Sequence, residues 1–152
     1  MLLILALLLG FVSGLRTMMA PAAASWAARS GVLAVAGTPL AFMDFKYTPI
    51  LLTVFALAEL ITDKLPRTPS RLVPPQFIAR IISGALVGAT INAAAGSLIL
   101  GSIAGAIGAV CGTYSGAVLR RWMASKFQRD LPAALIEDTL AIGLSILVVT
   151  RF

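Results

Sequence analysis

Four of the six acidic residues lie inside apolar stretches of the chain: Glu59 and Asp63 in "AELITDKLP", and Glu137 and Asp138 in "ALIEDTLAIG". A charge at the centre of a membrane helix costs about 2.5–3.5 kcal/mol, so such residues face the bundle interior and mark a pathway or an ion pair. Glu59 and Asp63 are four residues apart and therefore share one helical face. We expect the four carboxylates to line a polar site that binds a cation or relays protons.

A purely structural role for these acids is the alternative. They would then pair with Arg16, Arg80 or Lys64 and fix the helices to one another. Asp63 and Lys64, close to a membrane edge, are also compatible with a pair whose charged ends reach the interface. The sequence leaves the two interpretations open.

Arg16 lies in "SGLRT", five residues before Pro21. Proline breaks helical hydrogen bonding, so this stretch can unwind the first helix and direct Arg16 toward an acid or an anionic substrate. The alternative is a short first helix that simply ends at Arg16. We include Arg16 among the candidate substrate- or ion-binding residues.

The chain has no histidine and one cysteine, Cys111. Disulfide frameworks, Cys/His metal sites, haem ligation by histidine and histidine-based catalytic triads are therefore excluded. No nucleophile or cofactor-binding loop stands near the acids, so we expect no cofactor and no catalytic residues, and the identity of any metal stays open. Paired carboxylates can act as general acid and base, which makes a lipid-acting membrane enzyme a third, weaker hypothesis.

Composition places these residues in a membrane protein. Hydrophobic residues make up 59% of the 152 positions and charged residues 12%, about half of the share that is typical of soluble domains. Lysine and arginine stand mainly between apolar segments, where they orient helices in a bilayer, and this placement argues against nucleic-acid binding despite the net charge of +6.

We expect one transmembrane domain, residues 1–152, built as an all-α bundle of about five spans. The first helix is expected to be retained, because no basic region precedes it as in a signal peptide. The short apolar stretch 31–43 predicts a re-entrant or interfacial segment, since a span needs about 20 residues. The proline-rich stretch 66–76 predicts an extended linker, and 120–130 a basic loop. The expected spans are residues 1–30, 47–65, two within 77–122 joined by a turn near 92–97, and 131–150.

The basic residues predict the orientation of this bundle. With five spans, two groups of four fall on one side of the membrane, leaving Arg29, Lys46 and Arg151 on the other. The positive-inside rule then places the amino terminus in the cytoplasm and the carboxyl terminus outside. The two groups are Lys64, Arg67, Arg71 and Arg80, and Arg120, Arg121, Lys126 and Arg129.

Two pairs of similar short stretches in the sequence suggest an inverted repeat. The stretch 60–63 (LITD) resembles 135–138 (LIED), and Ser13 to Arg16 resembles Ser115 to Arg120. In an inverted repeat the site lies where the repeats meet. At 1.5 Å per residue, Glu59 and Asp138 each lie about 9–10 Å into their helices, so the two groups of acids are expected to meet at one depth.

Glycines at four-residue steps predict close helix packing. The packing can be within the chain or between subunits, and the small volume enclosed by five spans makes a homo-oligomer plausible. The positions are Gly84, Gly88, Gly101, Gly105, Gly108, Gly112 and Gly116.

The order of "SGLRTMMAPAAASWAAR", "LAELITDKLPRTPSRL", "ARIISGALVGA" and "LIEDTLAI" resembles the DUF4126 family of uncharacterised bacterial membrane proteins. The resemblance covers essentially the whole chain and implies an inner-membrane, multi-pass protein. It supplies no activity. The landmark positions it implies are Gly14, Leu15, Arg16, Glu59, Asp63, Lys64, Pro66, Glu137 and Asp138.

We therefore expect a transporter or channel for a small solute whose carboxylates bind a cation or proton. The alternative is a membrane scaffold or assembly protein with structural ion pairs. A water-accessible cavity at Glu59 and Asp138 favours the first hypothesis, and acids fully paired with arginine or lysine favour the second. The expected partners are the bilayer, a small ion or solute, and further copies of the chain.

Overall fold

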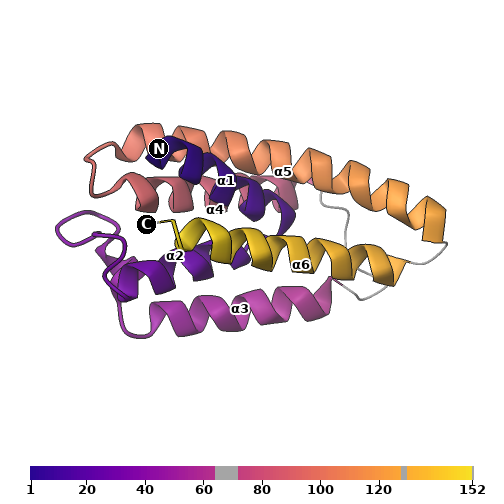
Figure 1. The fold of residues 1–152 in the computed structure, drawn as a ribbon, viewed down its shortest axis with the longest axis horizontal. Helices are drawn as coiled ribbons and strands as arrows, with labels where there is room; N and C mark the ends of the chain where they lie inside the picture. The colour runs from indigo at the N-terminus through magenta and orange to yellow at the C-terminus, as the bar shows by residue number, and fades with distance from the viewer. Residues whose placement is uncertain (64–71, 128–129, 152) are drawn as a thin grey trace.

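The computed structural model describes residues 1–63, 72–127 and 130–151 (Figure 1). Over these residues the chain is all-helical, without a β-strand, which confirms the predicted fold class. The elements are α1 (Leu2–Leu15), α2 (Met19–Arg29), the 3-10 helix η1 (Ala41–Asp44), α3 (Thr48–Thr62), α4 (Pro74–Asn92), α5 (Leu98–Phe127) and α6 (Asp130–Val149).

The first apolar segment is broken into two short helices. Helix α1 ends at Leu15, Arg16 is extended with φ −139° and ψ 116°, and α2 begins at Met19. Proline lacks the N–H that would bond to residue i−4 and its ring clashes with that carbonyl, so a helix running through Arg16 would be disrupted at Pro21. The break places Pro21 in the first turn of α2, where no N–H is needed. The structure combines the two interpretations of this stretch: α1 is short and ends at Arg16, its C-cap residue, and Arg16 faces acids from other helices.

Helix α2 turns back toward the end of the bundle at which α1 began (Figure 1). Helices α3 to α6 then run along the bundle in alternating directions, so both termini lie at the end opposite to the carboxyl-terminal ends of α3 and α5, which precede the two basic connections in the sequence. The prediction that the first segment crosses the bundle is therefore wrong, and so is the prediction that the amino terminus shares a side with those basic connections. Lys64, Arg67, Arg71, Pro66 and Arg129 lie outside the described residues.

Two other segments differ from prediction. Residues 31–43, predicted as a re-entrant or interfacial segment, form turns and the start of η1, which leaves the interfacial alternative, and Leu33, Val35 and Met43 bury their side chains in the core. The stretch from Arg120 to Phe127, predicted as a basic loop, continues α5 because its residues are good helix formers. The predicted turn after Asn92 is present, with Gly96 at φ 66°.

The helix directions do not fit an inverted repeat. Helices α3 and α6 run in opposite directions, as such a repeat requires, but α1 and α5 run in the same direction (Figure 1). The reversal at Arg16 causes this difference, because α1 no longer leads into α3. The two acidic stretches thus lie on helices of opposite direction, but the second pair that an inverted repeat needs, α1 and α5, is missing.

Glycines bring α1, α4 and α5 into close contact. Gly84 and Gly88 of α4 face Gly101 and Gly105 of α5, so that the two backbones touch. The next glycines of α5, Gly108 and Gly112, lie against the carbonyl groups of Leu7 and Phe11 in α1. The structure thus places six of the seven predicted packing glycines at contacts within the chain, while Gly116 lines a cavity described below.

The outer surface is apolar and the interior holds charges. Exposed isoleucine, leucine, valine and phenylalanine side chains cover α3, α5 and α6, while Arg16, Arg80, Glu137 and Asp138 are buried. By length and composition, one described helix, Leu98–Met123, is long and apolar enough to cross a membrane, and α1 and α3 are shorter apolar helices. This gives weak support for a membrane location, and five spans are not confirmed.

Candidate functional site

Arg16 lies at the break between α1 and α2 and contacts aspartates from two other helices. Its Nη1 is 2.7 Å from Oδ2 of Asp63, at the end of α3, and its Nη2 pairs with Oδ1 of Asp138 in α6. The Arg16 side chain is 1% exposed. A buried arginine in such a position must be compensated by acids, because leaving its charge unpaired away from water is very costly.

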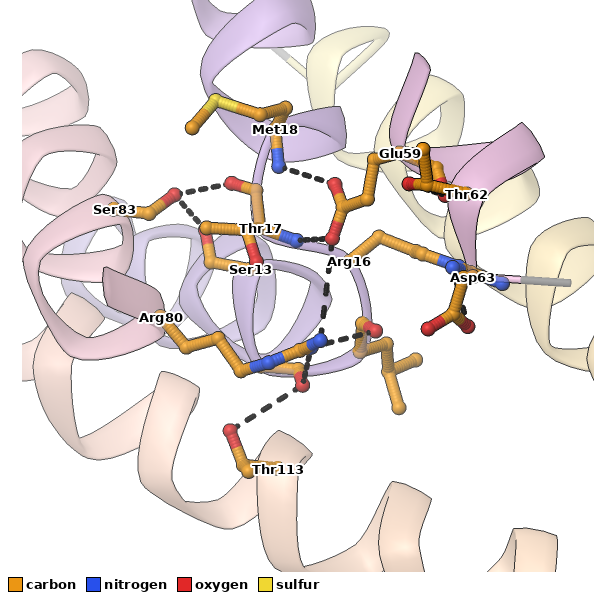
Figure 2. Close-up of polar contacts among 12 residues, drawn as sticks. Ser13, Arg16, Thr17, Met18, Glu59, Thr62, Asp63, Arg80, Ser83 and Thr113 are labelled. Carbon is orange, nitrogen blue, oxygen red and sulfur yellow. Dashed lines mark hydrogen bonds and ion pairs between the residues drawn. The ribbon is translucent and has the colours of Figure 1, made fainter. Parts of the chain in front are cut away.

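Glu59 binds the amino-terminal end of α2. Its two carboxylate oxygens accept hydrogen bonds from the backbone N–H groups of Thr17 and Met18, at 2.7 and 2.8 Å (Figure 2). The first N–H groups of a helix lack partners within the helix, and the helix dipole favours a negative charge there. Glu59 therefore serves as an N-terminal cap supplied by a distant helix, since the N-cap residue Met18 makes no side-chain capping bond.

Arg80 of α4 caps the carboxyl-terminal end of α1 with a positive charge. Its Nη1 donates to the carbonyl oxygens of Gly14 and Leu15 at 2.7 and 2.8 Å, and its Nη2 lies 4.0 Å from Oε1 of Glu59 (Figure 2). A cation is favoured where the helix dipole ends and carbonyl groups lack partners. The two ends of the broken helix are thus held by an arginine and a glutamate that also lie near each other.

Hydroxyl groups complete the contacts around the break. Ser83 donates to the carbonyl oxygen of Thr17, the group that Pro21 has no N–H to satisfy, and also contacts the hydroxyl of Ser13 (Figure 2). Thr113 of α5 reaches the carbonyl oxygen of Gly14 at 3.3 Å. These residues, together with Arg80, tie the reversal to α4 and α5.

Asp63 connects the buried centre to a more exposed arginine. The same oxygen, Oδ2, that faces Arg16 also accepts a hydrogen bond from Nη1 of Arg120 at 2.9 Å. Exposure of these side chains rises from 1% for Arg16 through 10% for Asp63 to 21% for Arg120. The three groups form a charged path from the centre of the bundle toward the end where α3 and α4 are connected.

Glu137 precedes Asp138 in α6 and is buried. It lines a cavity of ≈ 720 Å³ between α1, α5 and α6 whose walls are otherwise formed by side chains such as Leu15, Leu119 and Leu140. Tyr114 lines the same cavity and packs edge-to-face on Phe77, with ring centroids 5.7 Å apart. Of the five residues predicted to share one polar site, the structure therefore brings together Arg16, Glu59, Asp63 and Asp138.

The chemistry open to this cluster is that of ion pairs and protons. Among the described residues no group of three histidine, cysteine or acidic side chains is arranged to hold a metal ion. Nε of Arg16 is buried and has no hydrogen-bond acceptor among the described residues. Two carboxylates compete for one arginine, and protonation of either weakens its hold.

Sequence reasoning found the acids and Arg16, and it named Arg80 only as a pairing partner or a loop cation. The capping roles of Glu59 and Arg80 depend on a helix break whose ends meet distant helices. Ser13, Ser83 and Thr113 were not singled out. Their signal was a hydroxyl in an otherwise apolar helix, which is weak because such hydroxyls often bond to their own backbone.

The described part of the chain is an all-helical bundle with buried charges and exposed apolar side chains. Many different proteins share these features. Residues 3–151 match the family model described as "Domain of unknown function (DUF4126)". The chain belongs to this family, in agreement with the resemblance seen in its motifs. No curated protein and no solved structure matches the chain.

Proposed function

We propose that this chain is a multi-pass membrane protein that moves protons, alone or coupled to a small solute, through the charge cluster around Arg16. One observation carries the proposal: two aspartates from different helices converge on one buried arginine at the break of a discontinuous helix. Discontinuous helices whose ends surround a polar site inside the bundle recur in secondary transporters.

The distribution of side chains supports the membrane location. Apolar residues cover the outside of α3, α5 and α6 and charged residues are buried, the reverse of what water favours. Exposed aromatic side chains also gather around the loop between α2 and α3, as at a membrane–water interface. They are Trp26, Phe42, Phe45 and Tyr47.

The basic residues support an orientation in a bacterial inner membrane in which the carboxyl-terminal end of α5 faces the cytoplasm. Arg120 and Arg121 lie near that end, which also carries the connection between α3 and α4 (Figure 1). The positive-inside rule assigns such an end to the cytoplasm. Both termini then face the opposite side.

The transport step follows from the shared arginine. A proton entering beside Arg120 binds Asp63 and neutralises its carboxylate, and Arg16 then keeps its pair with Asp138. Transfer of the proton from Asp63 to Asp138 returns Arg16 to Asp63, and release of the proton from Asp138 toward the opposite side of the membrane restores both ion pairs. Because Arg16 is the residue at which α1 ends, each exchange of partner acts on the junction of α1 and α2.

Proton flux into liposomes tests the proposal. The purified wild-type chain is reconstituted with an internal pH-sensitive dye, and a pH gradient is imposed with the membrane potential clamped. Gly143→Ala is the matched control, because nothing lies within 4 Å of a Cβ at that position. We expect wild type and control to acidify the lumen faster than protein-free liposomes. Equal rates in all three, also in sodium and potassium gradients, would contradict transport.

A second function, a non-transporting membrane scaffold, is favoured by a different observation. Glu59, Asp63 and Asp138 each contact an arginine, and Glu59 and Arg80 both serve as helix caps. In this account the ion pairs hold the α1–α2 reversal in place and nothing passes the cluster. A folded, reconstituted chain without flux in any gradient would select this account.

A further inference from the structure

The cavity between α1, α5 and α6 adjoins the Arg16 cluster through Leu15 and Glu137 but has no part in the proposed transport step. Its walls carry Phe11, Tyr114, Val118, Trp122, Leu140 and Leu144. Glu137 is the carboxylate among the described lining residues, and it is 2% exposed, so it presents little charge to the space. The cavity is therefore a site for an apolar chain.

A positive charge lies beyond one end of this apolar wall. Arg121 follows Val118 by three residues and Tyr114 by seven, so it continues the same face of α5 toward the end of that helix. It is exposed, and its Nε lies 3.3 Å from the carbonyl oxygen of Ala117, one turn back. An arginine fork binds phosphate oxygens well, and clusters of basic residues next to membrane helices attract anionic headgroups.

We propose that this cavity seats an acyl chain of an anionic phospholipid whose phosphate is bound by Arg121. The inference rests on the proposed membrane location, but it is independent of transport. Trp122, half exposed beside Arg121, is an indole of the kind that lies at headgroup level in membrane proteins. The apolar walls and the arginine thus match the two parts of one lipid molecule.

Quenching of Trp122 by brominated lipid tests this inference. In the Trp26→Phe variant Trp122 is the single tryptophan of the chain. The variant is reconstituted into phosphatidylcholine vesicles in which a minor fraction of the lipid is replaced by a lipid with brominated acyl chains. This brominated lipid is phosphatidylglycerol in one sample and phosphatidylcholine in the other. We expect the brominated anionic lipid to quench more strongly. Adding Arg121→Gln should lower the enrichment of anionic lipid about fivefold, whereas Arg151→Gln, an exposed arginine at the other end of the bundle, should not change it.

Several outcomes would overturn the inference. Equal quenching by the two lipids would mean either that a second copy of the chain covers the cavity or that lipids contact it without preference, and both contradict a site for anionic lipid. A preference that survives Arg121→Gln would also overturn the inference. Helical content measured by circular dichroism shows whether each variant is folded. A chain that stays out of the vesicles altogether would contradict the membrane location itself, which separates that failure from failure of the lipid site alone.

Discussion

Arg16 and Asp138 are 122 positions apart in the sequence and form an ion pair inside the bundle, with Asp63 on the other side of the same guanidinium. The pair joins the break after α1 to the middle of α6, the last helix of the chain. The reversal of the first segment is therefore supported by residues from nearly the full length of the chain, which makes the charge cluster part of both the fold and the candidate site.

Replacing Arg16 should destabilise the protein more than replacing either aspartate. Arg16→Met removes the cation that both Asp63 and Asp138 contact, and breaking a buried pair from one side costs about 3–5 kcal/mol. Asp138→Asn keeps a hydrogen-bonding side chain and leaves Arg16 its contact with Asp63, so we expect about 1–3 kcal/mol. Denaturant unfolding in detergent micelles, followed by circular dichroism, measures both. Equal losses for the two variants would contradict the shared-arginine arrangement.

The role of Glu59 as a cap predicts a graded response. Glu59→Ala removes both acceptors from the N–H groups of Thr17 and Met18, and loss of a cap costs about 0.5–2 kcal/mol. Glu59→Gln keeps one good acceptor and should cost less. Thermal unfolding in micelles distinguishes the two variants. If Glu59→Ala unfolded at the same temperature as wild type, Glu59 would not be holding the start of α2.

Helix contact through glycine predicts opposite effects at two positions. In Gly105→Ala the added methyl group would meet the backbone of Gly84, and overpacking of this kind costs about 1–3 kcal/mol. Gly143 is also helical but has open space around it, so Gly143→Ala should stabilise α6 by about 0.5–1 kcal/mol. Unfolding midpoints of the two variants on opposite sides of wild type are expected. A stabilised Gly105→Ala variant would contradict the close approach of α4 and α5.

How far the sequence predicts this structure can be judged at particular residues. Apolar length and glycine spacing predicted most helices and close helix packing, because those features depend on residues close in the chain, but they left open whether the glycines pack within the chain or between subunits. The buried acids were identifiable because charge in an apolar segment is costly. Pro21 signalled a break after Arg16, but proline specifies only that a helix is interrupted. Whether the chain continues or reverses depends on Glu59 and Arg80 binding the two helix ends, a contact across more than forty residues.

The same reversal explains the wrong topology. Counting residues 1–30 as one span put the amino terminus with the basic connections and made an inverted repeat conceivable. Arg80 was counted among the basic residues of the loop before α4. Its side chain instead lies on the buried face of α4 and contacts the end of α1. Glu137 and Asp138 are adjacent residues of one helix and point about 100° apart, and Asp138 is the one seen to pair with Arg16.

The membrane location makes a prediction that needs no mutation. Cys111 is the only cysteine in the chain, is exposed, and lies near the middle of the candidate span Leu98–Met123. In intact vesicles we expect it to react with neither a charged, membrane-impermeant maleimide nor, at an appreciable rate, a small lipophilic one, because a thiol in lipid does not ionise to the reactive thiolate. Unfolding in detergent should expose it to both reagents. Fast labelling by the charged reagent in intact, reconstituted vesicles would show that this face of α5 is in water.

A comparison of Asp138→Asn with Glu59→Gln in the liposome flux assay separates a proton site from a helix cap. In the proposed mechanism Asp138 exchanges a proton beside Arg16, and Glu59 caps the start of α2. Asp138→Asn liposomes should therefore acidify no faster than protein-free ones, while Glu59→Gln liposomes, loaded with the same amount of folded protein, should retain flux. Wild-type flux in Asp138→Asn, or loss of flux in Glu59→Gln alone, would contradict a proton site at the Arg16–Asp138 pair.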